Sequence, residues 1–266
     1  RLSDHIGSLP LIMVSPSDTD LITGGSDERR KFMDIFLSQF DKEYLHSLIR
    51  YNKALQQRND LLKADGFADD TLFELWDGQL VEEGKVIYNK RKEFIDKFIP
   101  TFQHYYDFIC SSNERVQLAY EYHFALEDFP AVLKQRKERD KILGYTTAGI
   151  HKDDLDMQMD GYSIKKVGSQ GQNKTFVVAL KMAQFDFLKK ATNTTPILLL
   201  DDIFDKLDSS RVEQIMKLVL DKNFGQIFIT DTNREHLDEI LSQTNSSYHL
   251  YEVVKGEVIQ KNSTVL

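Results

Sequence analysis

The sequence has little cysteine, no long apolar segment and no excess of positive charge, and each absence excludes a class of protein. The single cysteine among 266 residues, Cys110, permits neither an internal disulfide nor a cysteine-based zinc site, and it favours a reducing compartment. No apolar run approaches the ~20 residues that cross a bilayer, and no basic and then apolar signal segment opens the chain. We therefore expect a cytoplasmic protein without a membrane partner.

The charge balance is acidic, with 34 Lys and Arg against 42 Asp and Glu and a formal charge of −8. This balance argues against a surface coated with positive charge for nucleic acid, although it leaves room for a local basic patch. With 41% hydrophobic and 29% charged residues, the composition is that of a globular chain. The opening residues, from Arg1, read like the middle of a domain, so we expect a fragment.

The hydrophobic pattern divides the chain into three parts. Residues 1–27 are turn-rich around one apolar strand, residues 28–113 place apolar side chains at helical spacing, and residues 114–266 mix strands and helices. In the third part, PILLLDD, SSRVEQIMKLVL and QIFIT predict a buried strand, a helix and another buried strand, which is the unit of a parallel sheet. The last strands are predicted to form a hairpin that turns at Lys255-Gly256. The pattern therefore predicts an α/β fold with a helical insertion.

The strongest chemical signal is a pair of adjacent carboxylates at the end of the first of these strands. Asp201 and Asp202 follow apolar residues 197–200, and α/β sheets bind ligands at the carboxyl ends of their strands. In phosphoryl-transfer sites the first acid holds Mg²⁺ and its neighbour orients the attacking water. The alternative is two acids that only leave a core strand. Six residues on, Asp208 precedes a helix, for which either Asp208 or Ser210 is the expected N-cap.

A glycine-rich turn opens the helix before this strand and admits two phosphate-binding interpretations. As a Walker A loop, G-x-x-x-x-G-K-[ST], residues 168–175 have Asn173 in place of the second glycine, and its side chain would obstruct the approach of backbone to phosphate. As the S-x-G-Q signature of ATP-binding-cassette ATPases, Ser169, Gly171 and Gln172 match without exception. We favour the signature, with a plain helix N-terminus as the remaining alternative.

Four further segments, together with these motifs, resemble the RecF family of bacterial recombination-mediator ATPases, which are allied to SMC proteins. They are SPSDTDLITGGSDERRKFMD at 15–34, YNKALQQRN at 51–59, WDGQL at 76–80 and GIHKDDL at 149–155. These segments are similar to the family patterns SPEDL…GxPxxRRRFLD, YxxxLxQRN, WDxQL and GPHRDDL. Ile150 and Lys152 depart from the last pattern. The resemblance covers nearly the whole chain.

The resemblance implies an α/β fold that is part of an ABC-type P-loop NTPase head, with an all-helical arm inserted in it. Residues 1–27 and 114–266 then belong to the head and residues 28–113 form the arm, or lobe II. Because no G-x-x-x-x-G-K-[ST] occurs in the 266 residues, we expect this chain alone to bind ATP weakly and to show negligible turnover. The intact family member is expected to use ATP and Mg²⁺, to form a homodimer through ATP, and to act with double-stranded DNA near single-strand gaps and with recombination mediator proteins.

The resemblance also implies a role for each candidate site residue. Asp201 holds Mg²⁺ and Asp202 positions the hydrolytic water. Thr230 and Asp231 occupy the position after the last sheet strand where many cassette ATPases place a switch histidine, and His236 lies five residues beyond. The residues expected to contact nucleotide or partner across the dimer are Ser169, Gly171, Gln172 and Asp208.

Three basic clusters are candidates for DNA contact. Arg29, Arg30 and Lys31 follow a turn and are the preferred cluster, whereas 90–92 and 134–141 are read as solvated charged faces. His151 with the acids that follow it suggests a metal site less strongly than a packed loop, because adjacent residues cannot all face one ion.

Two other functions remain open at this point. A chain without Walker A can serve as a non-catalytic module that binds a partner protein. Another SMC-like ATPase head is also possible, although such heads interpose long heptad coils and the helical part here spans only about 85 residues without sustained heptads.

Overall fold

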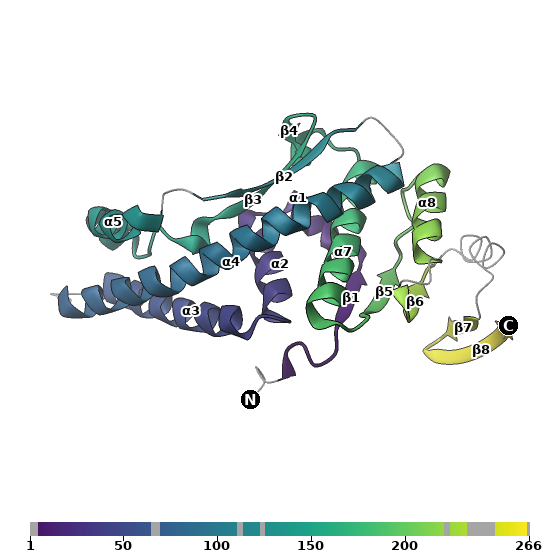
Figure 1. Ribbon diagram of the computed structural model, residues 1–266, viewed down its shortest axis with the longest axis horizontal. Coiled ribbons are helices and arrows are strands. Elements are labelled where there is room, and N and C mark those ends of the chain that lie inside the picture. The colour runs from purple at the N-terminus through teal and green to yellow at the C-terminus, as the bar shows by residue number, and fades with distance from the viewer. Residues whose placement is uncertain are drawn as a thin grey trace.

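The structure is a computed structural model that describes residues 5–64, 70–110, 114–122, 126–220, 224–232 and 248–264. Its elements mix helices and strands, as the sequence predicts (Figure 1). In chain order they are β1 (Leu11–Val14), η2 (Pro16–Thr19), α1 (Asp20–Thr23), α2 (Ser26–Ser38), α3 (Lys42–Lys63), α4 (Asp70–Cys110), β2 (Val116–Glu121), η3 (Leu126–Asp128), α5 (Phe129–Leu143), η4 (Ile150–Lys152), β3 (Asp154–Met159), β4 (Tyr162–Ser163), α6 (Ile164–Val167), α7 (Gln170–Thr192), β5 (Ile197–Asp201), α8 (Ser209–Val219), β6 (Ile227–Thr230), β7 (Tyr248–Val254) and β8 (Glu257–Thr264).

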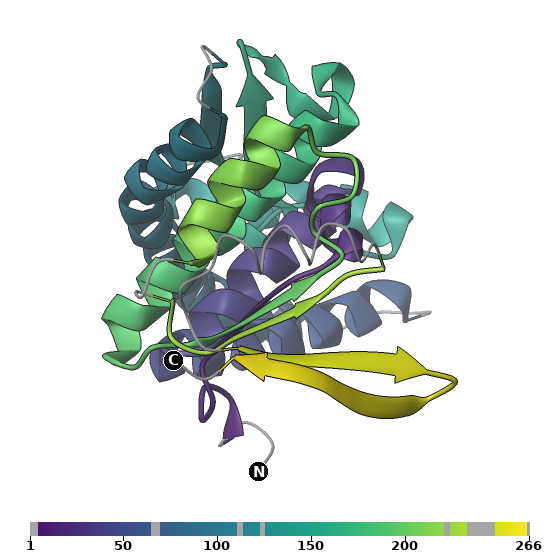
Figure 2. The ribbon, with the colours of Figure 1, turned by 90° about the vertical axis from the view of Figure 1, so that its right-hand side faces the viewer.

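The first sheet is parallel and has the order β1-β5-β6 among the described residues. Strand β5, helix α8 and strand β6 form the predicted βαβ unit, and Figure 2 shows α8 in front with the parallel strands below it. Leu198 and Leu200 of the central strand are buried, as expected. The expectation that β6 is also buried is wrong, because among the described residues this strand pairs with β5 alone and its Phe228 side chain is 51% exposed.

The other two sheets are antiparallel. Strands β2, β3 and β4 form one of them, and β3 alternates half-buried and buried side chains because one face packs on the core. Strands β7 and β8 form the predicted hairpin at the end of the molecule away from the arm (Figure 1). Lys255 and Gly256 both have positive φ, at 51° and 88°, as a two-residue type I′ turn requires.

In its described part, the arm predicted at residues 28–113 contains helices α2, α3 and α4. Helices α3 and α4 pack against each other along their lengths, and α4, at 41 residues, extends roughly 60 Å across the molecule at 1.5 Å per residue (Figure 1). Asp41 caps α3 by accepting a hydrogen bond from the Tyr44 backbone N–H. The expected boundaries of head and arm stay a prediction, because α4 packs on the arm helix α3 and on α7 as well.

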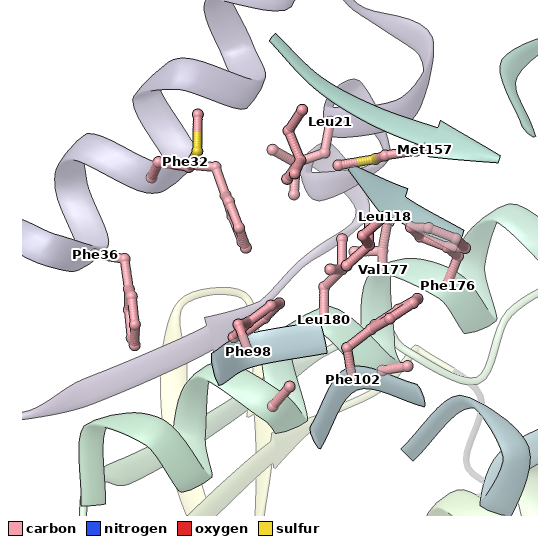
Figure 3. Close-up of a cluster of buried hydrophobic side chains, with 14 of the residues drawn as sticks. Leu21, Phe32, Phe36, Phe98, Phe102, Leu118, Met157, Phe176, Val177 and Leu180 are labelled. Carbon is pink, nitrogen blue, oxygen red and sulfur yellow. The ribbon is translucent and has the colours of Figure 1, made fainter. Parts of the chain in front are cut away.

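Aromatic side chains from distant segments meet in the core (Figure 3). Phe102 of α4 lies 4.8 Å from Phe176 of α7 between ring centroids, so the long helix and the helix of the glycine-rich turn share one buried interface. The helical spacing identifies the buried Phe32 and Phe36 of α2 correctly, but it also includes Ile35, whose side chain is 66% exposed.

Three of the segments that carry the family resemblance meet along the arm, where α3 and α4 lie beside α5 and the 149–155 loop (Figure 1). Arg58, from 51–59, is fully buried and donates hydrogen bonds to Asp77 of the 76–80 segment at 2.6 Å and to Asp140 of α5 at 2.8 Å. Tyr51 pairs with Nδ1 of His151 in the 149–155 loop at 2.8 Å. The residues of these patterns therefore hold one another in place.

A second buried arginine lies in the same region. Arg91 is 1% exposed, bonds the Asp34 carboxylate at 2.7 Å and donates to the Ile150 carbonyl at 2.9 Å. The reading of 90–92 as a solvated basic face is therefore wrong at its central residue. Consecutive side chains on a helix differ in direction by about 100°, so one member of a run of three charged residues can point into the protein.

Candidate functional site

The carboxyl ends of β5 and β6 bring together the predicted metal and water residues. The Thr230 hydroxyl donates a hydrogen bond to Oδ1 of Asp201, and the Asp202 backbone N–H donates to the Thr230 carbonyl at 2.9 Å. Asp202 itself lies in the left-handed region at φ 50°, which costs energy for a residue other than glycine. The strand end is thus held in a strained turn that leaves both carboxylates half-buried.

The glycine-rich turn predicted to be the signature, called the signature turn below, caps helix α7. Ser169 is the N-cap, and its hydroxyl accepts a hydrogen bond from the Gln172 N–H while the Gln172 side chain accepts one from the Ser169 N–H at 2.8 Å. Ser169 remains exposed. A Cβ added at Gly171 would lie 3.2 Å from the Lys206 carbonyl, so glycine at this position allows the helix to approach the loop after β5.

Lys174 is the residue on which the two interpretations of this turn differ most. Its ammonium donates to the carbonyls of Asp202 and Asp205, at 2.8 and 2.9 Å, and it therefore points into its own chain. Burial lowers the pKa of Lys174, while the charges of Asp205 and Asp202 act in the opposite direction. Two of the three donors of the ammonium are thus bonded to carbonyls, and the signature interpretation stays a prediction.

The loop after β5 ends at Asp208, which is the N-cap of α8. Its carboxylate accepts from the Arg211 backbone N–H at 3.0 Å and lies 3.3 Å from Arg211 Nε. Of the two expected caps the structure selects Asp208, and Ser210 lies inside the helix. Asp208 and the preceding Lys206 are exposed, so this loop and the signature turn share a surface.

Glu114 has no sequence motif and yet links these elements. One carboxylate oxygen accepts hydrogen bonds from Gln172 and Arg211, each at 3.0 Å, and the other accepts from the Tyr106 hydroxyl at 2.5 Å and from Cys110 at 3.3 Å. Nothing in the string SNERV distinguishes this acid from a solvated one, so spacing could not have found it.

The preferred basic cluster is largely engaged within the protein. Arg29 forms a two-pronged pair with Asp154, at 2.7 and 2.8 Å, and Arg30 donates to the Asp153 carbonyl at 2.7 Å. Lys31 is exposed and pairs with Glu28. Contact of this cluster with DNA stays a prediction, for which Lys31 is the most accessible member.

The 149–155 loop fits the packed interpretation. His151 is half-buried, with its second ring nitrogen 3.0 Å from the Thr146 carbonyl. Within the described ranges, no three His, Cys, Asp or Glu side chains gather as a metal site. No helix in that part of the chain has the apolar length for a bilayer crossing. His236 lies outside the described residues.

Comparison with known proteins gives close relatives. No family model matches the chain. The DNA replication and repair protein RecF of Bacteroides thetaiotaomicron is 58% identical over 258 residues, which cover 97% of this chain and 70% of that protein. The protein of the same name from Parabacteroides distasonis is 59% identical over 258 residues, with the same coverage.

Solved structures agree with these relatives. The recombination mediator protein RecF-ATPrS in the RecFOR pathway matches 98% of this chain and 70% of that chain, with a TM-score of 0.81 and 26% identity. An Smc head domain from Pyrococcus furiosus, at 14% identity and a TM-score of 0.50, shows a likeness of fold alone. The α/β fold is therefore that of an ATPase head of this kind, and the chain belongs to the family of the DNA replication and repair protein RecF.

Proposed function

We propose that this chain is part of an ATP-dependent DNA repair protein, in which two copies close on ATP and open after its hydrolysis. The chain carries the signature turn, the strand-end carboxylates and the Asp208 loop of each copy. The observation that supports it most is the shared surface of the signature turn and the Asp208 loop, on which Ser169 and Asp208 are exposed while Lys174 turns inward. A helix N-terminus of this kind attracts an anion through its free N–H groups and dipole. The phosphate it meets then belongs to the nucleotide of the partner copy.

The residues at the strand ends fit a magnesium ion and a reacting water. The Asp201 carboxylate and the Thr230 hydroxyl lie together, and Mg²⁺ in nucleotide sites needs only one or two carboxylates because phosphate and water complete its shell. When bound, the ion neutralises charge on the phosphates. Asp202 orients the attacking water as a base, and Asp231, beside Thr230, senses the γ-phosphate or holds water.

The names of the relatives support the biological setting. The matched solved structures are of RecF-ATP and RecF-ATPrS in the RecFOR pathway, and the curated relatives are DNA replication and repair proteins. We propose that the closed dimer binds double-stranded DNA near single-strand gaps in the cytoplasm and acts there with recombination mediator proteins. Lys31 is the first residue to examine for phosphate contact.

Ser169→Arg in the full-length protein tests this proposal. The added cation occupies the space between the helix N-terminus and the partner's phosphate, so ATP-dependent dimerisation should fail while ATP affinity of the monomer stays unchanged. Sedimentation with ATP and Mg²⁺ and nucleotide titration measure the two quantities. Ala191→Arg, at the exposed far end of the same helix, is the matched control and should dimerise normally. Loss of monomer ATP binding in Ser169→Arg with normal dimerisation would show that the turn grips nucleotide within its own chain.

A further inference from the structure

The carboxylate of Glu114 contacts residues of three helices, α4, α7 and α8. It is 19% exposed and follows the long helix α4. One of its oxygens faces two residues of α4, Tyr106 and Cys110, and the other faces Gln172 of α7 and Arg211 of α8. A single side chain thus joins the arm to both motifs that the proposed function places at the dimer.

The two residues that Glu114 holds on α7 and α8 each contact an exposed residue of the proposed site. Gln172 accepts the Ser169 N–H through its side-chain oxygen, so a carboxylate that holds the amide nitrogen also fixes the orientation of that cap. Arg211 lies against Asp208 through Nε and 3.4 Å from a Cβ added at Gly171. The carboxylate therefore sets the position of the signature turn relative to the Asp208 loop.

The charge of Glu114 suits this position. Burial alone raises its pKa, but the hydrogen bonds from Tyr106 and Gln172 outweigh burial and hold the pKa below its usual value. The group is consequently ionised at neutral pH, and its bonds to Arg211 and Gln172 are charge-assisted.

We propose that Glu114 is a positioning residue that couples the orientation of the arm helix α4 to the signature turn and the Asp208 loop. The inference rests on the proposed function, because it assumes that these two motifs meet a partner copy. A small movement of the last turn of α4 then changes whether Ser169 and Asp208 are presented together. Binding at the arm can in this way favour or oppose closure on ATP.

The first test compares Glu114→Gln with Glu213→Gln in the full-length protein. Glu213 lies on α8, two residues after Arg211, and pairs with the exposed Lys217 of the same helix at 2.7 Å, which makes it a matched control. Glu114→Gln should keep the monomer's ATP affinity and weaken ATP-dependent dimerisation at least about tenfold, the scale of one charge-assisted hydrogen bond. Dimerisation equal to that of the parent, or an equal loss of ATP affinity, would overturn a positioning role.

The second test needs no nucleotide and so separates this inference from the proposed function. Tyr106→Phe removes the shorter of the two hydrogen bonds by which α4 holds Glu114, at 2.5 Å, and leaves the one from Cys110 at 3.3 Å. Amide hydrogen exchange should become at least several-fold faster in residues 169–173 and 208–212. The control is Tyr88→Phe, closer to the N-terminus of α4, which should leave exchange in both segments unchanged. Unchanged exchange in Tyr106→Phe would overturn the coupling. If the parent fails to dimerise with ATP, the proposed function fails, and the exchange result still decides whether Glu114 couples arm and turn.

Discussion

Two polar regions of this molecule use their hydrogen bonds differently. Along the arm, Arg58 and Arg91 are 0% and 1% exposed and form ion pairs with acids from other helices, Arg58 through Nε and Nη1. At the sheet edge, Asp202 lies in a strained backbone conformation, while Ser169 and Asp208 face solvent. Buried polar groups that satisfy one another stabilise a fold, whereas strain and accessible charge indicate a site. Changes in the first region should therefore cost stability, and changes in the second should cost activity.

The largest expected effect is on turnover at the sheet edge. Asp202→Asn in the full-length protein should retain ATP binding and stability and lose roughly 10²- to 10⁴-fold in ATP turnover, the scale of a general base. Steady-state hydrolysis and nucleotide titration measure the two quantities. An equal loss of nucleotide affinity would assign Asp202 to metal binding instead.

The next effect concerns the buried arginines of the arm. Arg58→Ala leaves the buried Asp140 carboxylate without its cation, and breaking a buried pair in this way costs about 3–5 kcal/mol of unfolding free energy. Denaturant unfolding should show this loss, while exposed Arg139→Ala changes stability by less than about 0.5 kcal/mol. A loss below about 1 kcal/mol in Arg58→Ala would contradict the structural role of this region.

A smaller effect follows from the pH. Burial lowers the pKa of His151 to about 4 in the folded protein, whereas the same ring has a pKa near 6.5 in the unfolded chain. Between these two values the unfolded chain binds a proton that the folded protein does not. Stability is intact above this range and falls as the pH drops from about 6.5 towards 4, by about 2 kcal/mol between pH 7 and 5. Unfolding of the parent and of His151→Gln at both pH values isolates the contribution. Parallel pH profiles for the two proteins would show that His151 titrates normally.

The smallest effect concerns the cap of α8. Asp208→Ala should lower the unfolding free energy by about 1 kcal/mol, because the Arg211 N–H loses its acceptor. Asp208→Asn keeps an acceptor and should cost less than half as much. If the two variants are equally destabilised, the charge and not the cap supplies the stability.

Much of the fold follows from local pattern. The run ILLLDD, the helix after it and the Lys255-Gly256 turn are each encoded within a few residues, and the structure contains all three. Side-chain exposure is harder to predict from sequence. The burial of Phe228 depends on what lies beyond an edge strand, and the burial of Arg91 depends on which side of α4 packs against α2 and α3.

The site is predictable only where it is carried by a motif. Asp201, Asp202 and Ser169 stand in recognisable strings, but Glu114 acts through partners at positions 106, 172 and 211, which no spacing brings together. Lys174 likewise fits a phosphate-binding pattern in sequence, and only its bonds to the carbonyls of Asp202 and Asp205 show that it points inward.

The central claim is that the signature turn and the strand-end carboxylates of one chain serve different nucleotides, and mixing two inactive proteins tests it most directly. Ser169→Arg and Asp202→Asn, each in the full-length protein, should show little ATP turnover alone. In a symmetric dimer a mixed pair contains one site with both residues intact. The account predicts that the mixture shows ATP turnover well above the sum of the two separate variants. A protein that carries both substitutions in one chain should show none. Turnover no higher than that sum would contradict it, since both residues would then serve the same nucleotide.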